Sequence, residues 1–283
     1  MLPPGMFLPS LLGISPVYHR QVYLSRLFCG ETFDKTRDMV YNTGKSKGAD
    51  YMEKLKNIKG IFFDLGGTLI YPPSGSWRFS ELAYRYFPKD RLSEPSVQAA
   101  MAEASRRLDE NHLLHSTDEE YAQFYEYYRA VSAALPELGL TDEDLRTVTD
   151  DKVYNKADNY RLFNDSLETL KAVYGRYKLG IISDTWPSIV PLLEYLDISK
   201  YFDCITFSFE LGTFKPDRRM YEDALSKMGL PPESTVFIDD SARNLAGAKA
   251  AGINPVLIRA MPGIEPVEGI PGIDRISGLL KLL

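Results

Sequence analysis

From Ile58 onward, the chain alternates short apolar runs with longer segments of helical periodicity. Five runs of four or five mainly branched or aromatic residues are short enough to be strands buried on both faces. They are Gly60–Phe63, Leu179–Ile182, Cys204–Phe207, Thr235–Ile238 and Pro255–Ile258. Helical patterns at 187–197, 217–229 and 241–251 separate the later runs. This alternation predicts an α/β fold with a parallel sheet.

More than a hundred residues separate the first predicted strand from the second, which is too many for one crossover helix. Helical patterning runs through most of residues 76–150. We expect Ser93, Thr117 and Thr141 to cap helices at 94–113, at 118–134 and from 142 onward. The sequence therefore predicts an α/β core at 58–72 and 160–283, interrupted by an all-helical domain at 73–159.

Aromatic residues recur at helical spacing within this insertion, at Tyr121, Phe124, Tyr125 and Tyr128. Such a row is either a stacking platform or the buried stripe of a helical bundle. The chain is acidic, so we favour the buried stripe.

Residues 1–57 differ from the rest of the chain. Their apolar start is interrupted by prolines, and no Lys or Arg precedes it, which argues against a secretory signal. We expect a poorly ordered N-terminal extension. An alternative is that Met52 is the true start, because it leads directly into the first predicted strand.

Composition excludes several classes of function. The formal net charge is −6, with the acids spread along the chain, which argues against a nucleic-acid surface or an anionic membrane surface. No apolar run approaches the roughly 20 residues of a membrane-spanning helix. Cys29 and Cys204 form no CxxC motif, so neither a disulfide framework nor a cysteine zinc site is expected. The predicted compartment is the cytoplasm.

Polar residues of particular kinds follow the predicted strands. Asp64 comes after the first strand, Ser183 and Asp184 after the second, and Asp239 and Asp240 after the fourth. The third strand is followed by a loop that contains Lys215. The carboxyl ends of parallel strands lie along one edge of the sheet, where ligands bind. We therefore expect these side chains to converge.

The chemistry of this set points to Mg²⁺ and a phosphoryl group. Converging carboxylates repel one another unless a cation or a proton lies between them, and hard oxygen ligands suit Mg²⁺ better than zinc. Lys215 and the Ser183 hydroxyl could bind phosphoryl oxygens, and the N–H groups of the Gly66–Gly67 turn could approach closely. Asp64 would then attack phosphorus. Taken singly, each residue has an ordinary structural role as a helix cap or a loop residue.

These motifs resemble those of the haloacid dehalogenase-like hydrolase superfamily. They are DxxGT within Phe62–Thr68, hhhS at Gly180–Ser183, GxxKP at Gly212–Pro216 and DDSxxN within Val236–Asn244. The resemblance implies a Rossmann-like core with a helical cap, and Mg²⁺ as cofactor. It also implies Asp64 as nucleophile, Ser183 and Asp184 with the Gly66–Gly67 turn as phosphoryl binders, and Lys215 as charge stabiliser. The metal ligands would be Asp64, Asp240 and the Gly66 carbonyl, with Asp239 as an auxiliary carboxylate.

One position departs from the pattern of the superfamily's phosphatases. Their second aspartate, which protonates the leaving oxygen and later activates water, is Gly66 in this chain. The sequence thus leaves three alternatives: a phosphatase that acts on a small phosphorylated metabolite, a phosphonatase-like hydrolase, and a catalytically impaired member that binds phosphate or a partner. A phosphonatase needs a cap lysine, and nothing local distinguishes Lys89, Lys152 and Lys156. We expect the phosphatase, acting as a monomer or homodimer.

Overall fold

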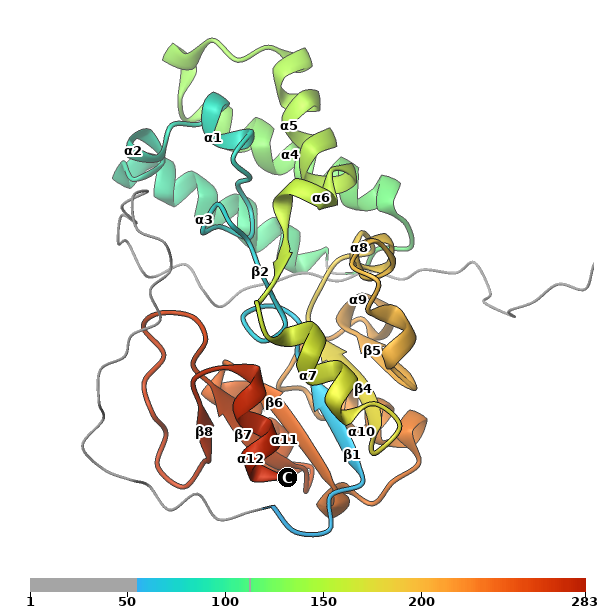
Figure 1. The fold of residues 1–283 in the computed structure, drawn as a ribbon. Helices are drawn as coiled ribbons and strands as arrows, with labels where there is room; N and C mark the ends of the chain where they lie inside the picture. Colours follow the sequence, from blue (N-terminus) through green and yellow to red (C-terminus); the bar gives the residue numbers. More distant parts are fainter. Residues whose placement is uncertain (1–54, 112) are drawn as a thin grey trace, which may run out of the picture.

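The computed structural model describes residues 55–111 and 113–283, so the predicted extension falls almost entirely outside the described residues, as does Met52. Six strands form a parallel sheet in the order β5-β4-β1-β6-β7-β8 (Figure 1). Their bounds are β1 Gly60–Phe63, β4 Lys178–Ser183, β5 Cys204–Phe207, β6 Thr235–Asp239, β7 Asn254–Ile258 and β8 Gly272–Ile273. The five predicted strands are confirmed. The sixth, β8, has only two residues and therefore shows no periodicity of its own.

Helices cover both faces of the sheet because consecutive strand residues are buried on opposite sides. In β1, Ile61 and Phe63 pack into one apolar cluster, and Phe62 packs into another. The first cluster includes residues of α7 and α8, and the second includes residues of α10 and α11. The helices of the core are α7 Ser166–Val173, α8 Ile189–Tyr195, α9 Ser208–Leu211, α10 Arg218–Met228, α11 Ala242–Ala250 and α12 Leu279–Leu282. The predicted α/β architecture is therefore correct.

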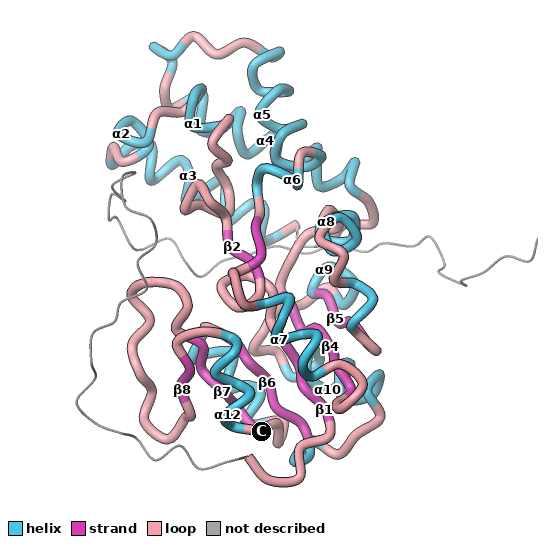
Figure 2. The backbone as a smooth tube through the Cα atoms, viewed as in Figure 1, coloured by secondary structure: helices cyan, strands magenta, loops and turns pink. Residues whose placement is uncertain are grey.

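The helices of the insertion gather beyond the edge of the sheet where its strands end (Figure 1). They are α1 Ala83–Tyr86, α2 Lys89–Leu92, α3 Pro95–Glu110, α4 Thr117–Ala133, α5 Asp142–Tyr154 and α6 Lys156–Asn159. Their buried side chains form a separate apolar cluster, which takes in Trp186 from the core. Two short antiparallel strands, β2 Ile70–Tyr71 and β3 Arg161–Leu162, carry the chain into and out of this cap (Figure 2). The sequence pattern did not predict them.

Two of the three residues predicted to cap helices of the insertion were wrong. Ser93 ends α2, and α3 begins after an extended Glu94 with Pro95 in its first turn. Proline suits this position because the first turn needs no N–H donor. For α4 the cap is Ser116 rather than Thr117, since the Ser116 side chain accepts from the N–H of Glu119. Thr141 caps α5 as predicted, in a reciprocal capping box with Asp144.

The aromatic row is the buried stripe of the cap. Phe124 and Tyr128 are completely buried, and Tyr121 and Tyr125 are partly buried against the same cluster. This burial confirms the interpretation as a packing stripe. Among the described residues, no helix is long and apolar enough to cross a membrane.

Candidate active site

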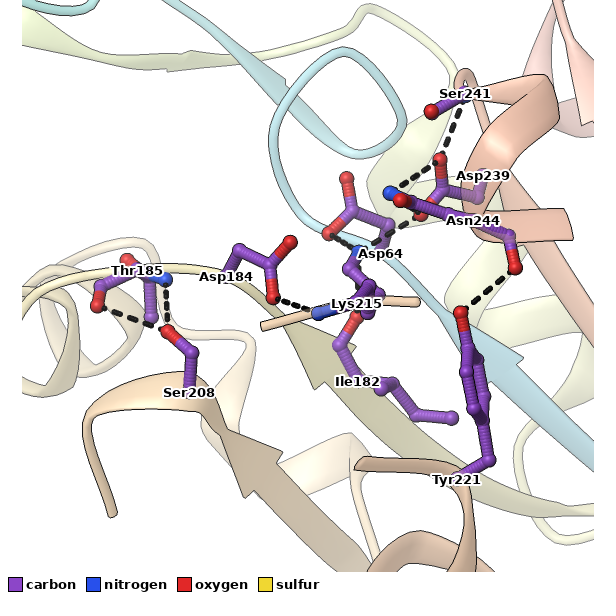
Figure 3. A network of polar contacts seen from close by, with 10 residues as sticks. All are labelled: Asp64, Ile182, Asp184, Thr185, Ser208, Lys215, Tyr221, Asp239, Ser241 and Asn244. Atoms are coloured by element: carbon purple, nitrogen blue, oxygen red, sulfur yellow. Dashed lines mark hydrogen bonds and ion pairs between the residues drawn. The ribbon is translucent and has the colours of Figure 1, made fainter. Parts of the chain in front are cut away.

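Three neighbouring strands bring the predicted polar residues to one edge of the sheet. Asp64 directly follows β1, Ser183 is the last residue of β4, and Asp239 is the last residue of β6. Because β4, β1 and β6 are adjacent and parallel, these side chains meet, and all three are buried. Figure 3 shows Asp64 and Asp239 close together at this edge, and Ser183 lines the same pocket as Asp64.

Lys215 occupies the centre of this group. Its Nζ lies 2.7 Å from Asp64 Oδ1 and 2.7 Å from Asp239 Oδ2, and it also donates to the carbonyl of Ile182 at 3.1 Å. The side chain is 1% exposed, so this is a buried ion-pair network (Figure 3). Burial raises the pKa of Asp64, and the Lys215 ammonium opposes that rise.

The two consecutive aspartates after β6 differ in their surroundings. Asp239 accepts hydrogen bonds from the N–H of Ser241, from the Asn244 amide and from Lys215. Its oxygens are therefore largely used in holding the lysine and the start of α11. Asp240 instead lies against the glycine turn after β1. This contact leaves Asp240, more than Asp239, turned toward the predicted phosphoryl site.

The carboxylates fit a divalent cation. Asp64, Asp239 and Asp240 each offer an oxygen, these oxygens lie within 4.8 Å of one another, and all three residues are buried. An all-oxygen donor set of this kind suits a hard cation such as Mg²⁺ or Ca²⁺. Lys215 alone balances only one of the three negative charges, so a cation there would be electrostatically favourable.

The turn after β1 requires glycine at position 67 and has a close neighbour at position 66. Gly67 has φ +77°, and a Cβ there would lie 2.1 Å from Asp240 Oδ2. Only glycine permits both this backbone conformation and this close approach. At Gly66, a Cβ would lie 3.1 Å from the ring of Trp77. An indole ring therefore borders the space that a side chain at position 66 would enter.

Asp184 is a further buried carboxyl near Asp64. Its Oδ1 accepts the backbone N–H of Lys215 at 2.9 Å, so it fixes the loop that carries the lysine (Figure 3). Burial raises the pKa of Asp184 to about 7, although the Lys215 charge acts in the opposite direction. Asp184 thus helps to position Lys215, in addition to its predicted place beside the phosphoryl group.

Core and cap together enclose a pocket of about 240 Å³ above these residues. Asp64, Ser183, Lys215 and Asp240 line it from the core. The cap and its connections contribute an aromatic and cationic wall that includes Trp77, Arg78, Lys152 and Tyr160. The carboxylates therefore lie at the core end of the pocket, whereas the cap end carries cations and aromatic rings.

Sequence reasoning did not find most of this wall. Trp77 and Tyr160 were not predicted, and Lys152 was not distinguished from the other cap lysines. A signal for Lys152 exists in the helical period: Leu145, Val148 and Thr149 are buried on α5, and Lys152 continues their stripe seven residues after Leu145. A lysine on a buried stripe is a candidate functional residue.

A buried hydrogen-bonded contact joins the cap to the core beside the pocket. Glu120 on α4 is completely buried, and its carboxylate accepts from the N–H of Ser188 at 2.8 Å and from its hydroxyl at 2.6 Å. Ser188 directly precedes α8, only five residues after Ser183. This contact holds the cap against the loop that follows β4.

The chain is similar to known proteins both in sequence and in fold. Phosphoglycolate phosphatases of Salmonella typhimurium and Escherichia coli K12 are 28% and 27% identical over 213 residues, covering 71% of this chain and 81% of each relative. L-2-haloacid dehalogenase from Xanthobacter autotrophicus shares the fold with a TM-score of 0.55 at 18% identity, over 80% of this chain and 98% of the dehalogenase. The 2-haloacid dehalogenase of Pseudomonas syringae pv. Tomato DC3000 has a TM-score of 0.52 at 21% identity, over 80% of this chain and 97% of that one. The haloacid dehalogenase-like hydrolase family model matches residues 58–252, well over half of the chain, and the protein therefore belongs to this family of hydrolases.

Proposed function

We propose that this hydrolase is a Mg²⁺-dependent phosphatase that acts on a small phosphorylated metabolite through an aspartyl-phosphate at Asp64. The observation that carries the proposal is the Lys215 ammonium, which lies 2.7 Å from both Asp64 and Asp239, with Lys215 and Asp64 lining the pocket. This cluster offers a nucleophile, a fixed positive charge and a place for a cation in a buried setting. The curated relatives, which are named phosphoglycolate phosphatases, support the same reaction class.

Each residue has a role that its position supports. Asp64 attacks phosphorus, and Lys215 and the Ser183 hydroxyl bind phosphoryl oxygens. The N–H of Gly67 donates to the carbonyl of Ile70 at 2.9 Å, so the predicted contribution of the Gly66–Gly67 turn falls to the N–H of Gly66. Asp184 orients the loop of Lys215 through the backbone hydrogen bond.

Asp64, Asp240 and the Gly66 carbonyl would hold the ion. Asp239 acts mainly on Lys215, since its oxygens already accept from the lysine, Ser241 and Asn244. When bound, Mg²⁺ would neutralise the phosphoryl oxygens and balance the buried carboxylates. The cytoplasm remains the predicted compartment, and a monomer or homodimer the predicted assembly.

A phosphonatase-like reaction is the second candidate, and one observation favours it. Such an enzyme needs a cap lysine at the substrate. Lys152 lines the pocket, whereas Lys89 is exposed and donates to the carbonyl of Ser74. Borohydride would trap a lysine imine on Lys152 if the protein cleaved an aldehyde-bearing phosphonate in this way.

Phosphate release from 4-nitrophenyl phosphate, an acyl phosphate and 2-phosphoglycolate tests the main proposal. We expect turnover that requires Mg²⁺ and is abolished by Asp64→Asn, with ³²P transferred to the wild-type chain from labelled substrate. Arg106→Gln is a suitable control, because Arg106 pairs with Glu103 and Glu110 on the exposed face of α3. A folded wild-type protein that binds phosphate but releases none from any substrate would instead support the impaired member.

A further inference from the structure

Position 66 leaves the proposed reaction without an acid for its leaving group. Gly66 has no side chain, and the Trp77 ring lies 3.1 Å from where its Cβ would be. An alkoxide leaving group departs slowly unless it is protonated, and a positioned acid typically contributes about 10²–10⁴ in rate. Another proton source must therefore face the pocket if alkyl phosphates are substrates.

Tyr160 brings a phenol hydroxyl to this wall of the pocket. Its ring stacks on Trp77, with centroids 5.7 Å apart and planes at 23°. Both residues line the pocket together with Asp64. Trp77 thus borders both Gly66 and Tyr160, and Tyr160 belongs with Trp77 to the cap wall of the pocket. The leaving oxygen departs opposite the attacking Asp64 oxygen, and therefore toward this side.

Lys152 is hydrogen-bonded to that hydroxyl. Its Nζ donates to Tyr160 Oη at 2.6 Å, and both side chains are buried. A phenol can accept one hydrogen bond while it donates another. The pair thus forms a short proton path from an ammonium, through a hydroxyl, toward the pocket.

Aromatic rings enclose the Lys152 ammonium. Nζ lies 4.9 Å from the centroid of Phe124, 5.3 Å from that of Tyr160 and 5.2 Å from that of Trp186. These faces attract the charged form, but they replace little of the water that the ammonium loses on burial. The lysine is therefore held in a fixed place from which release of its proton is favoured.

The charged groups that face Lys152 act in both directions. Burial lowers its pKa to about 8, Glu120 on α4 opposes this shift, Arg78 reinforces it, and Asp151 on α5 opposes it. An acid in this range can give up a proton and regain it near neutral pH. Arg78 is the other cap cation among the described residues that line the pocket.

We propose that the Lys152–Tyr160 pair supplies the proton of the leaving oxygen, in place of the carboxyl that position 66 lacks. This inference rests on the proposed phosphatase function. As the Asp64–phosphorus bond forms and the bond from phosphorus to the leaving oxygen breaks, the Tyr160 hydroxyl gives its proton to that oxygen. Lys152 returns a proton to Tyr160 and becomes neutral. In the second step, water attacks phosphorus, the bond to Asp64 breaks, and the proton of the water returns through Tyr160 to Lys152.

The test compares two leaving groups in the full chain with Mg²⁺. 4-Nitrophenolate departs with little protonation, whereas the glycolate oxygen of 2-phosphoglycolate requires it. For Lys152→Met and Tyr160→Phe we expect kcat on 2-phosphoglycolate to fall about 10²–10⁴-fold, and kcat on 4-nitrophenyl phosphate to fall less than tenfold. The alkaline limb of the wild-type pH profile, near pH 8, should be absent in Lys152→Met. Lys89→Met, on the exposed surface, is the matched control.

Further variants distinguish proton transfer from a purely structural role of the pair. Lys152→Arg keeps the positive charge but does not release its proton, so it should lose 2-phosphoglycolate turnover as Lys152→Met does. It can replace Lys152→Met in the test if the methionine variant does not fold. The proposal would be overturned if the Lys152 and Tyr160 variants lost kcat equally on both substrates, or if only their KM rose. It would also be overturned if Asp184→Asn, rather than these variants, lost kcat selectively on 2-phosphoglycolate. Asp64→Asn distinguishes failure of this proposal from failure of the proposed phosphatase function. If the phosphatase function is correct, Asp64→Asn must abolish turnover of 4-nitrophenyl phosphate.

Discussion

Replacement of Gly67 by alanine would impose two separate costs through one methyl group. The backbone has φ +77°, a region that costs an L-residue about 1–2 kcal/mol. The new Cβ would also lie 2.1 Å from Asp240 Oδ2, far inside any real contact distance. Since Gly67 belongs to a turn fixed by the sheet, the Asp240 carboxylate must rotate away from its place beside Asp64.

Gly175 offers a matched control for the backbone cost alone. It has φ +73°, and no heavy atom lies within 4 Å of its ideal Cβ position. Gly175→Ala should therefore lower the free energy of unfolding by about 1–2 kcal/mol and leave catalysis unchanged. Gly67→Ala should carry the same penalty and, in addition, disturb the proposed metal site.

Urea unfolding and Mg²⁺ titration of activity measure the two effects separately. We expect Gly67→Ala to need about 10–100-fold more Mg²⁺ for half-maximal turnover, which is the typical loss of metal affinity when a group around a bound metal is disturbed. Gly175→Ala should need the wild-type concentration. The same Mg²⁺ requirement and turnover in both variants would show that Asp240 does not lie where the structure has it.

Three further experiments test the site and the core. In the Lys152→Met background, Gly66→Asp alone should restore little 2-phosphoglycolate turnover because the Trp77 ring crowds its Cβ. Adding Trp77→Ala should raise this turnover by up to about 10²-fold. Equal turnover with and without Trp77→Ala would contradict the prediction. The Asp184 carboxyl, with a pKa of about 7, contributes stability that is lost as pH rises from about 4 through 7. In urea unfolding with EDTA, the free energy of unfolding of Asp184→Asn should therefore rise relative to that of the wild type over this pH range, by up to about 4 kcal/mol. A difference between the two proteins that does not change with pH would argue against this explanation. Gly180→Ala would place a Cβ 2.7 Å from the Phe62 ring and should cost about 1–3 kcal/mol of unfolding free energy, which wild-type urea stability would disprove.

The buried ion-pair network explains why the site is a poor source of stability. Lys215, Asp64 and Asp239 are taken out of water together, and the desolvation penalty of such a group offsets most of its mutual attraction. Removal of Lys215 alone would leave two buried carboxylates without their ammonium, which typically costs about 3–5 kcal/mol. Charged groups in this arrangement are better explained by chemistry than by folding.

The sheet edge of the site could be predicted because it depends on local sequence. Apolar runs of four or five residues form strands that are buried on both faces, and a polar residue placed directly after such a run must lie at the strand end. Parallel strands share that end, so Asp64, Ser183 and Asp239 were predicted to meet without any knowledge of strand order. Lys215 followed from the motif around it.

Tertiary structure decided which groups complete the site. Nothing in the pair Asp239–Asp240 says which carboxylate takes the lysine; the start of α11 and the glycine turn after β1 determine that. Trp77, Lys152 and Tyr160 come from separate segments of the insertion and its connections, and they meet only because the cap packs over the sheet edge. The physical reason is the range of the interactions: strand ends are fixed by hydrogen bonding within the sheet, whereas the cap wall is fixed by side-chain packing between distant segments.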